Sequence, residues 1–239
     1  MLLQLPLFPL QTVLFPGGWL PLRIFEIRYL DMIARCHKAG APFGVVSLSA
    51  GSETRQPATD GDTLRPAGEG YAAQAFFSVG TLARITRLDR PQAALMLIQC
   101  VGAQRFRIQR SAQQKYGLWV GDVELLADDS AVPVPDDLQH ARDALRTLVH
   151  NIEHSIEHSG EAGVQMPLCA PYRWDDCGWL ANRWCEMLPL SAELKQRLMA
   201  IDSPLLRLEL VADTLAQLQI TTARSDRRGR PSRPSPPTP

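Results

Sequence analysis

The sequence predicts an α+β protein whose N-terminal part consists mainly of strands and whose C-terminal part is helical. Three observations lead to this fold class. The first 29 residues are strongly apolar, but four prolines interrupt them, and a long helix does not tolerate proline in its interior. Residues 79–126 contain apolar runs and period-two alternation, which are typical of strands. Beyond a stretch rich in proline and aspartate at 127–135, the apolar residues recur with a helical period.

The opening segment, residues 1–29, is expected to form short extended pieces joined by turns. Pro16-Gly17-Gly18 is a strong turn signal within it. Such a segment stays folded only if later parts of the chain cover its apolar side chains. We therefore expect the rest of the fold to be organised around these residues.

A first helix is expected over residues 26–39, with Gly40 at its C-terminal cap. Its recurring apolar positions are Ile27, Leu30, Ile33 or Ala34, and His37. We expect a long mobile loop at 50–70, which is polar and rich in turn-forming residues. The strands of this part are expected at 43–48, 79–85, 93–101, 105–108 and 118–126, with a turn at Asp89-Arg90-Pro91. Alternation places Arg105 and Arg107 on one strand face, expected to be solvated unless it forms a cationic ligand site.

The C-terminal part, residues 136–222, is expected to contain at least four helices. Asp136 is a good N-cap with Gln139 three residues later, and Leu145 lies on the apolar stripe that follows. A second helix is expected over 174–188, with Trp184 in the core. Two further helix starts are expected at Ser191 and at Ser203-Pro204, where proline follows an N-cap serine. Residues 223–239 are rich in proline and arginine and carry too little apolar surface to fold, so we expect a disordered tail.

The composition is that of an ordinary globular protein. Equal numbers of basic and acidic residues, 25 of each, give the body no overall bias toward nucleic acid or anionic membranes. The N-terminus has no basic region, prolines break its apolar stretch, and no run is long enough to span a bilayer, so a cytoplasmic location is expected. The five cysteines form no CxxC pair and are expected to be free thiols.

Several motifs resemble the N-terminal domain of the Lon protease family, which also occurs as a free-standing bacterial protein. The opening pattern is Pro-Leu-Phe-Pro-Leu at 6–10, Phe-Pro-Gly at 15–17 and Leu-Pro-Leu-Arg-Ile-Phe-Glu at 20–26. Val-Gly-Thr-Leu-Ala-Arg-Ile at 79–85 and the helical segments extend the likeness over residues 4–218. The resemblance implies a curved, PUA-like β-barrel at 1–126, a linker at 127–135 and a helical subdomain at 136–222.

The resemblance also implies a function: recognition of exposed or unfolded polypeptide segments, as an adaptor or regulator of proteolysis, without chemistry of its own. Full-length Lon proteases carry an ATPase module and a serine–lysine peptidase after this domain. The present chain ends before both, and it lacks a phosphate-binding loop, so no catalytic residue, cofactor or metal ligand is expected. The candidate peptide-binding residues are Leu14, Phe15 and Trp19, because apolar residues beside proline–glycine turns are hard to bury completely. Burial of all three in the core is the alternative.

Two other functions compete with this one. His150-Asn151-Ile152-Glu153-His154 has the H-x-x-E-H order of inverted zinc peptidases, which favours a metallohydrolase. However, His150, His154 and His158 lie opposite the apolar stripe of their helix, so we expect a solvated polar face. RNA binding through a PUA-like barrel is the other alternative. The neutral body opposes it, and only the basic tail favours it.

Overall fold

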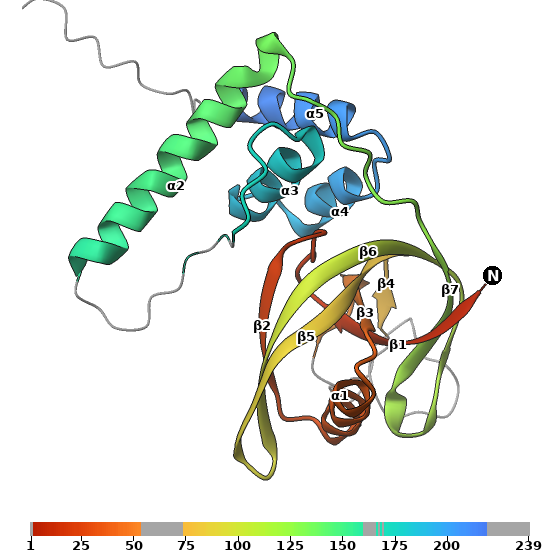
Figure 1. The fold of residues 1–239 in the computed structure, drawn as a ribbon. Helices are drawn as coiled ribbons and strands as arrows, with labels where there is room; N and C mark the ends of the chain where they lie inside the picture. Colours follow the sequence, from red (N-terminus) through yellow and green to blue (C-terminus); the bar gives the residue numbers. More distant parts are fainter. Residues whose placement is uncertain (1, 54–73, 160–165, 167, 169, 219–239) are drawn as a thin grey trace, which may run out of the picture.

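The computed structural model describes residues 2–53, 74–159, 166, 168 and 170–218. The predicted tail at 223–239 and most of the predicted loop at 50–70 lie outside the described residues, as does Cys169. We refer to residues 2–125 as the N-terminal half, to 127–135 as the connector and to 136–218 as the helical half. Figure 1 shows the helical half packed against one side of the strands.

Among the described residues of the N-terminal half, seven strands form a curved, barrel-like mixed sheet. They are β1 (Leu3–Leu10), β2 (Trp19–Ile24), β3 (Phe43–Ala50), β4 (Ala75–Phe76), β5 (Val79–Gln92), β6 (Leu95–Gln113) and β7 (Trp119–Leu125). The pairing follows the order β1-β7-β6-β5-β3-β4, and β2 pairs with β6. The sheet is closed unevenly by β1. The first part of β1 pairs antiparallel with β7, and its last part pairs parallel with β3.

Helix α1 (Ile27–Ala39) closes one end of the barrel-like sheet (Figure 1). Gly40 ends it with φ of 62°, as the C-cap prediction required. The predicted buried face was wrong in part: Ile33 is buried as predicted, but Ile27 is 83% exposed and Arg28 is buried instead. Arg28 donates to the Gly117 carbonyl at 2.7 Å and to Glu26 at 3.0 Å. These partners make burial of the guanidinium possible, so the buried face of the helix includes Arg28 and not Ile27.

The hairpin of β5 and β6 differs from the prediction in two respects. Its turn lies at residues 93–94, so the predicted turn at Asp89-Arg90-Pro91 was wrong and β5 continues through it. The expected solvated arginine face was also wrong in part. Arg107 is exposed, but Arg105 is only 3% exposed. The helical half covers this end of β6, so both faces of the strand are buried there.

The described part of the helical half contains a 3₁₀ turn (η2) and four helices. They are η2 (Asp136–Leu138), α2 (Gln139–Ser159), α3 (Cys177–Met187), α4 (Ala192–Met199) and α5 (Pro204–Gln217). The serine caps were predicted correctly: Ser191 accepts from the Leu194 N–H and Ser203 from the Leu206 N–H. The predicted cap at Asp136 was wrong. Its side chain instead accepts a hydrogen bond from the Gln139 amide at 2.7 Å.

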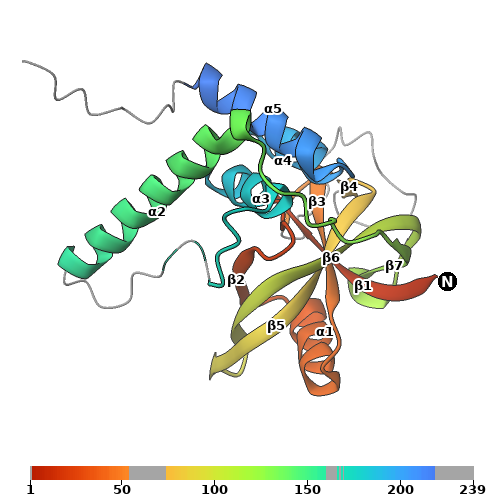
Figure 2. The ribbon, with the colours of Figure 1, turned by 45° about the horizontal axis from the view of Figure 1, so that its top comes forward.

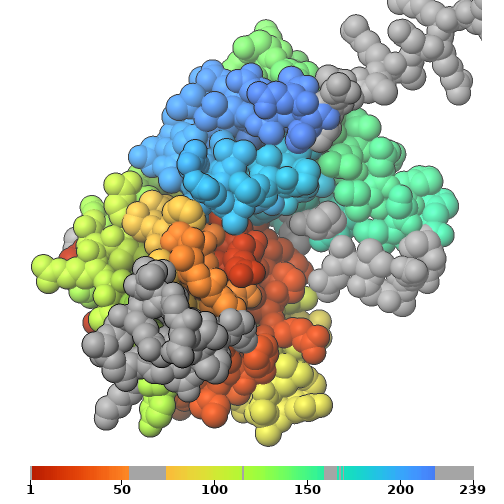
Figure 3. All heavy atoms as spheres, turned by 180° about the vertical axis from the view of Figure 1, so that it is seen from behind, coloured from red at the N-terminus to blue at the C-terminus, as the bar shows by residue number. Residues whose placement is uncertain are grey.

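The apolar core of the helical half includes side chains from the N-terminal half. Phe15 and Val79 pack in the same cluster as Trp184, which is 1% exposed and donates through Nε1 to the Ala141 carbonyl. Trp184 is therefore in the core, as predicted. Figures 2 and 3 show α4 next to the sheet, with α2 extending away from it. The shared cluster joins the two halves, so whether they unfold as separate subdomains, as the predicted boundary implies, stays a prediction.

A buried charge cluster also joins the halves. Arg207 of α5 is fully buried and donates to Asp129 of the connector at 2.6 Å and to Asn182 of α3 at 3.0 Å. Arg105 of β6 reaches the same aspartate at 3.3 Å and donates to the Met199 carbonyl at 2.9 Å. One carboxylate therefore connects strand β6, the connector and the last helix. We call these three residues, Arg105, Asp129 and Arg207, the arginine cluster.

Replacing Arg207 should strongly destabilise the protein. Arg207→Met leaves Asp129 partly buried with less charge compensation and leaves the Asn182 amide oxygen without this donor. Loss of one partner from a buried ion pair costs about 3–5 kcal/mol of unfolding free energy. Urea denaturation followed by circular dichroism measures this loss.

The matched control is Arg197→Met on α4. Arg197 pairs with Glu193 at 2.6 Å, but both side chains are largely exposed, at 73% and 62%. An exposed pair contributes about 0–1 kcal/mol. Equal, small losses in the two variants would show that the arginine cluster does not stabilise the fold.

Candidate functional site

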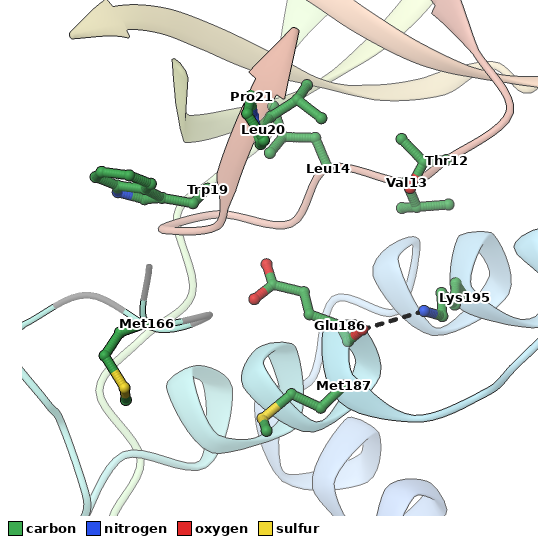
Figure 4. A pocket seen from close by; sticks show the side chains of 10 residues that line it. All are labelled: Thr12, Val13, Leu14, Trp19, Leu20, Pro21, Met166, Glu186, Met187 and Lys195. Atoms are coloured by element: carbon green, nitrogen blue, oxygen red, sulfur yellow. Dashed lines mark hydrogen bonds between the residues drawn. The ribbon is translucent and has the colours of Figure 1, made fainter. Parts of the chain in front are cut away.

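A cleft of about 400 Å³ lies where the opening segment meets the helical half (Figure 4). Its lining residues are Thr12, Val13, Leu14, Trp19, Leu20, Pro21, Met166, Glu186, Met187 and Lys195. One wall comes from residues 12–21, which include the start of β2. The other wall comes from the end of α3 and from α4. We call this space the cleft.

The three predicted peptide-binding residues have different environments. Phe15 is fully buried and Leu14 is 4% exposed, so the expectation that they are exposed anchors was wrong. The turn folds inward because the Leu14 carbonyl accepts a hydrogen bond from the buried Thr81 hydroxyl at 2.6 Å. Leu14 also lines the cleft, although its side chain is almost entirely buried. Trp19 is half-buried and lines the cleft directly, so it alone remains accessible as an anchor.

Arg183 of α3 holds the Pro16-Gly17-Gly18 turn in place. Its guanidinium, which is 3% exposed, donates to the Gly17 carbonyl at 2.6 Å and to the Pro16 carbonyl at 2.8 Å. It also pairs with Glu186 at 2.9 Å. A side chain at position 18 would have to displace Glu186, since a Cβ there would lie 2.0 Å from a Glu186 carboxylate oxygen and 3.0 Å from the Phe15 carbonyl oxygen. These contacts fix one wall of the cleft against the other.

Glu186 supplies the one carboxylate among the described residues that line the cleft. Figure 4 shows its side chain directed toward the opening segment. Burial raises the pKa of this carboxyl to about 7, and the nearby charges of Arg183 and Lys195 offset part of that effect. Lys195 also donates to the Glu186 carbonyl at 3.3 Å. The cleft therefore combines apolar walls with an acid that changes charge near neutral pH.

The apolar part of the cleft is suited to side chains of varied shape. Met166 and Met187 line the cleft on the side of the helical half, below Trp19 in Figure 4. Methionine is unbranched and polarisable, so methionine-lined surfaces adapt to different apolar groups. Trp19 adds a large aromatic surface, the kind of residue that often dominates binding energy. This arrangement can hold an apolar side chain, and it offers no activated nucleophile.

A second cavity, of about 280 Å³, lies beside the arginine cluster. Its lining includes the charged residues Asp128, Arg173 and Asp176 together with Arg105 and Asp129. Arg173 forms an ion pair with Asp176, and Asp176 caps α3 by accepting from the Gly178 N–H at 2.9 Å. These charges are already compensated within the fold, so this cavity is explained by its structural contacts.

The histidine motif of α2 faces solvent, as predicted. His150, His154 and His158 are exposed, and the rings of His154 and His158 stack at 3.9 Å. Glu153, the motif's glutamate, accepts a hydrogen bond from the Tyr172 hydroxyl at 3.0 Å. Within the described ranges, no group of three or more histidine, cysteine, aspartate or glutamate residues could hold a metal ion. The metallohydrolase alternative therefore gains no support from the geometry.

The cysteines of the described chain are buried thiols. Burial raises the pKa of Cys100 and of Cys185 to about 12, and it raises the pKa of Cys36 as well. These groups stay protonated at neutral pH and are therefore weak nucleophiles. Cys36 is buried while the adjacent His37 is exposed, so the two side chains diverge. The helices in the described ranges are also too short or too polar to cross a membrane.

Sequence reasoning missed the helical wall of the cleft. Arg183, Glu186 and Met187 occur in a helix that the pattern assigned correctly, but nothing local connects them with the opening turn. The one available signal was the pair Gly17-Gly18, since consecutive glycines often mark a close approach of other groups. The RNA-binding alternative depended on the tail, which lies outside the described residues, and it stays a prediction.

The raised pKa of Glu186 predicts that the stability of the protein depends on pH. The pKa is about 7 in the folded protein against an ordinary value of 4.5, so the folded state binds the proton more tightly. The contribution of Glu186 to stability is complete below pH 4.5 and is lost as the pH rises to about 7. The unfolding free energy of the unmodified protein should fall by about 1–3 kcal/mol over this window relative to Glu186→Gln.

Urea titrations of both proteins at half-unit steps from pH 4.5 to 7.5 measure that difference. The histidines are common to both chains, so their titration cancels in the subtraction. A difference that is flat or that rises with pH would mean that Glu186 ionises normally in the fold.

The comparisons with known proteins agree with the architecture. The chain matches the model of the ATP-dependent protease La (LON) substrate-binding domain over residues 4–217. No significant match was found among curated proteins. A Lon N-terminal domain protein from Xanthomonas campestris is 28% identical in sequence, with a TM-score of 0.63. The alignment covers 88% of this chain and 98% of that one.

A second structure shows the same fold at greater distance. The N-terminal domain of a Lon protease from the Mycobacterium avium complex has a TM-score of 0.55 at 13% identity. It is covered over 98% of its length, by 89% of this chain. At this identity the likeness supports the fold alone. The family match, in contrast, spans both the sheet and the helices described above, and the chain therefore belongs to the family of Lon substrate-binding domains.

Proposed function

We propose that this protein recognises apolar segments of unfolded polypeptides and presents them for proteolysis as an adaptor or regulator, without a reaction of its own. The observation that carries the proposal is the cleft. It places the accessible Trp19 opposite Met166 and Met187 at the junction of the two halves. The family description, a substrate-binding domain of an ATP-dependent protease, supports the same reading.

The chemistry of the cleft fits a polypeptide better than a small polar ligand. Its walls are mainly apolar, and its volume of about 400 Å³ accommodates one or two side chains. Unfolded chains expose such side chains, whereas folded proteins bury most of them. Binding should be weak, because a flexible segment loses conformational entropy when it docks. Micromolar affinity, about −8 kcal/mol, is expected for one such contact.

The non-catalytic part of the proposal rests on the groups available near the cleft. Glu186 is paired with Arg183 and not with a hydroxyl or thiol nucleophile. The buried cysteines keep their protons at neutral pH. Incubating the purified protein with an unfolded chain and following the products by mass spectrometry tests this part. Cleavage that disappears with a point mutation in this protein would overturn it.

Trp19→Ala should weaken polypeptide binding with little effect on stability. A suitable ligand is reduced, carboxymethylated α-lactalbumin, which cannot refold. Because Trp19 is half-buried and lies outside the apolar core clusters, its loss removes an anchor without opening a core cavity. The affinity should fall by about 1–3 kcal/mol, measured by fluorescence anisotropy. The melting temperature should stay within a few degrees.

The matched control is Phe25→Ala. Phe25 is an aromatic residue that is 58% exposed and does not line the cleft. Its removal should leave the affinity unchanged. If both variants bind as well as the unmodified protein, the cleft is not the binding site. If Phe25→Ala alone weakens binding, the site lies at the other end of the sheet.

A further inference from the structure

Strand β2 has one edge that no other described strand covers. It pairs antiparallel with β6 from Trp19 opposite Val101 to Ile24 opposite Met96, and it has no second partner among the described strands. Figures 1 and 2 show β2 at the outer side of the sheet, next to β6. An uncovered edge presents main-chain donors and acceptors that can pair with another extended chain.

The pairing pattern shows which residues of β2 present these groups. The Gly102 N–H donates to the Gly18 carbonyl, so Gly18 faces β6. In an antiparallel ladder the main-chain groups of successive residues alternate between the partner and the opposite side. Trp19, Pro21 and Arg23 therefore direct their main-chain groups away from β6. Pro21 is consistent with this register, because proline has no N–H and fits a strand only where none is needed.

The uncovered edge of β2 differs from another edge nearby. Beyond Ala83, β5 also lacks a partner on its outer side within the described residues, but that edge carries Arg87, Asp89 and Arg90. Charged side chains of this kind protect edge strands from pairing with other chains. The β2 edge instead begins at Trp19 and Pro21, which line the cleft. A chain paired with β2 would therefore place a side chain at the mouth of the cleft.

Charge indicates what else such a chain should carry. Arg23 on β2 is exposed, and it forms no ion pair with any described residue. It is opposite Leu97 of β6, on the same strand as Trp19 and four residues beyond it. An acidic side chain on the bound segment would complement this cation.

We propose that an extended, acidic polypeptide segment binds as an additional strand along the edge of β2. Its main chain pairs with the N–H groups of Trp19 and Arg23 and with the carbonyls of β2. One of its apolar side chains enters the cleft, and a carboxylate lies near Arg23. The proposal rests on the proposed function, because it specifies how the polypeptide is held at the same site.

A pair of substitutions at one position separates main-chain pairing from charge. Arg23→Ala removes the cation and keeps the N–H, whereas Arg23→Pro removes both. Proline is compatible with this register, as Pro21 shows, and circular dichroism verifies the fold of each variant. With reduced, carboxymethylated α-lactalbumin as ligand, Arg23→Ala should bind about twofold more weakly than the unmodified protein. Arg23→Pro should bind about fivefold more weakly than Arg23→Ala, as expected for one lost hydrogen bond.

Amide hydrogen exchange of the unmodified protein, resolved by NMR, gives a second measurement that needs no variant. On binding, exchange at the Trp19 and Arg23 N–H groups should slow at least tenfold. Exchange at Leu22, whose N–H already faces β6, should change little. Slower exchange at Trp19 and Arg23 together with weaker binding of Arg23→Pro supports the proposal.

Two outcomes contradict the proposal in distinguishable ways. If the unmodified protein binds the unfolded chain while exchange at Trp19 and Arg23 is unchanged and the two variants bind equally, strand addition is wrong but polypeptide recognition stands. If the unmodified protein does not bind the chain at all, the proposed function and this inference both fail.

Discussion

The arginine cluster is the interaction on which the relative placement of the two halves depends. Arg207 has no exposed surface, and a buried guanidinium requires compensating partners. Asp129 provides the charge, while Asn182 and backbone carbonyls complete the hydrogen bonds. Arg105 shares the same carboxylate from strand β6. Since hydrophobic packing alone is non-directional, we infer that this cluster selects one docking geometry among the many that would bury similar apolar area.

The cleft follows from a second buried arginine. Arg183 ties α3 to the carbonyls of Pro16 and Gly17, across 166 residues of sequence in the case of Gly17. This contact holds the opening turn against the helix. In this position Phe15 is buried in the shared core, and Trp19 lies half-buried at the surface. A cleft with walls fixed in this way would lose little entropy of its own on binding a ligand. The stability of the junction and the shape of the site thus have the same physical origin.

Local sequence signals predicted the elements better than their packing. The caps at Gly40, Ser191 and Ser203 were predicted correctly, because a cap depends on a few neighbouring residues. Burial of Arg105 and Arg28 was not, since each depends on partners far along the chain, at Asp129 and Gly117. The same limit applies to the site. The composition of the opening segment indicated Trp19, whereas Glu186 and Met187 join the cleft only through the tertiary fold.

The central claim is that unfolded polypeptide binds in the cleft between the opening segment and α3. Site-specific photo-crosslinking tests it most directly, with a benzophenone amino acid at Met187 in the cleft or at Ile27, which is 83% exposed elsewhere on the molecule. Illumination with reduced, carboxymethylated α-lactalbumin should give abundant adduct from position 187 and little from position 27. Equal yields from the two positions, or adduct from position 27 alone, would contradict the claim.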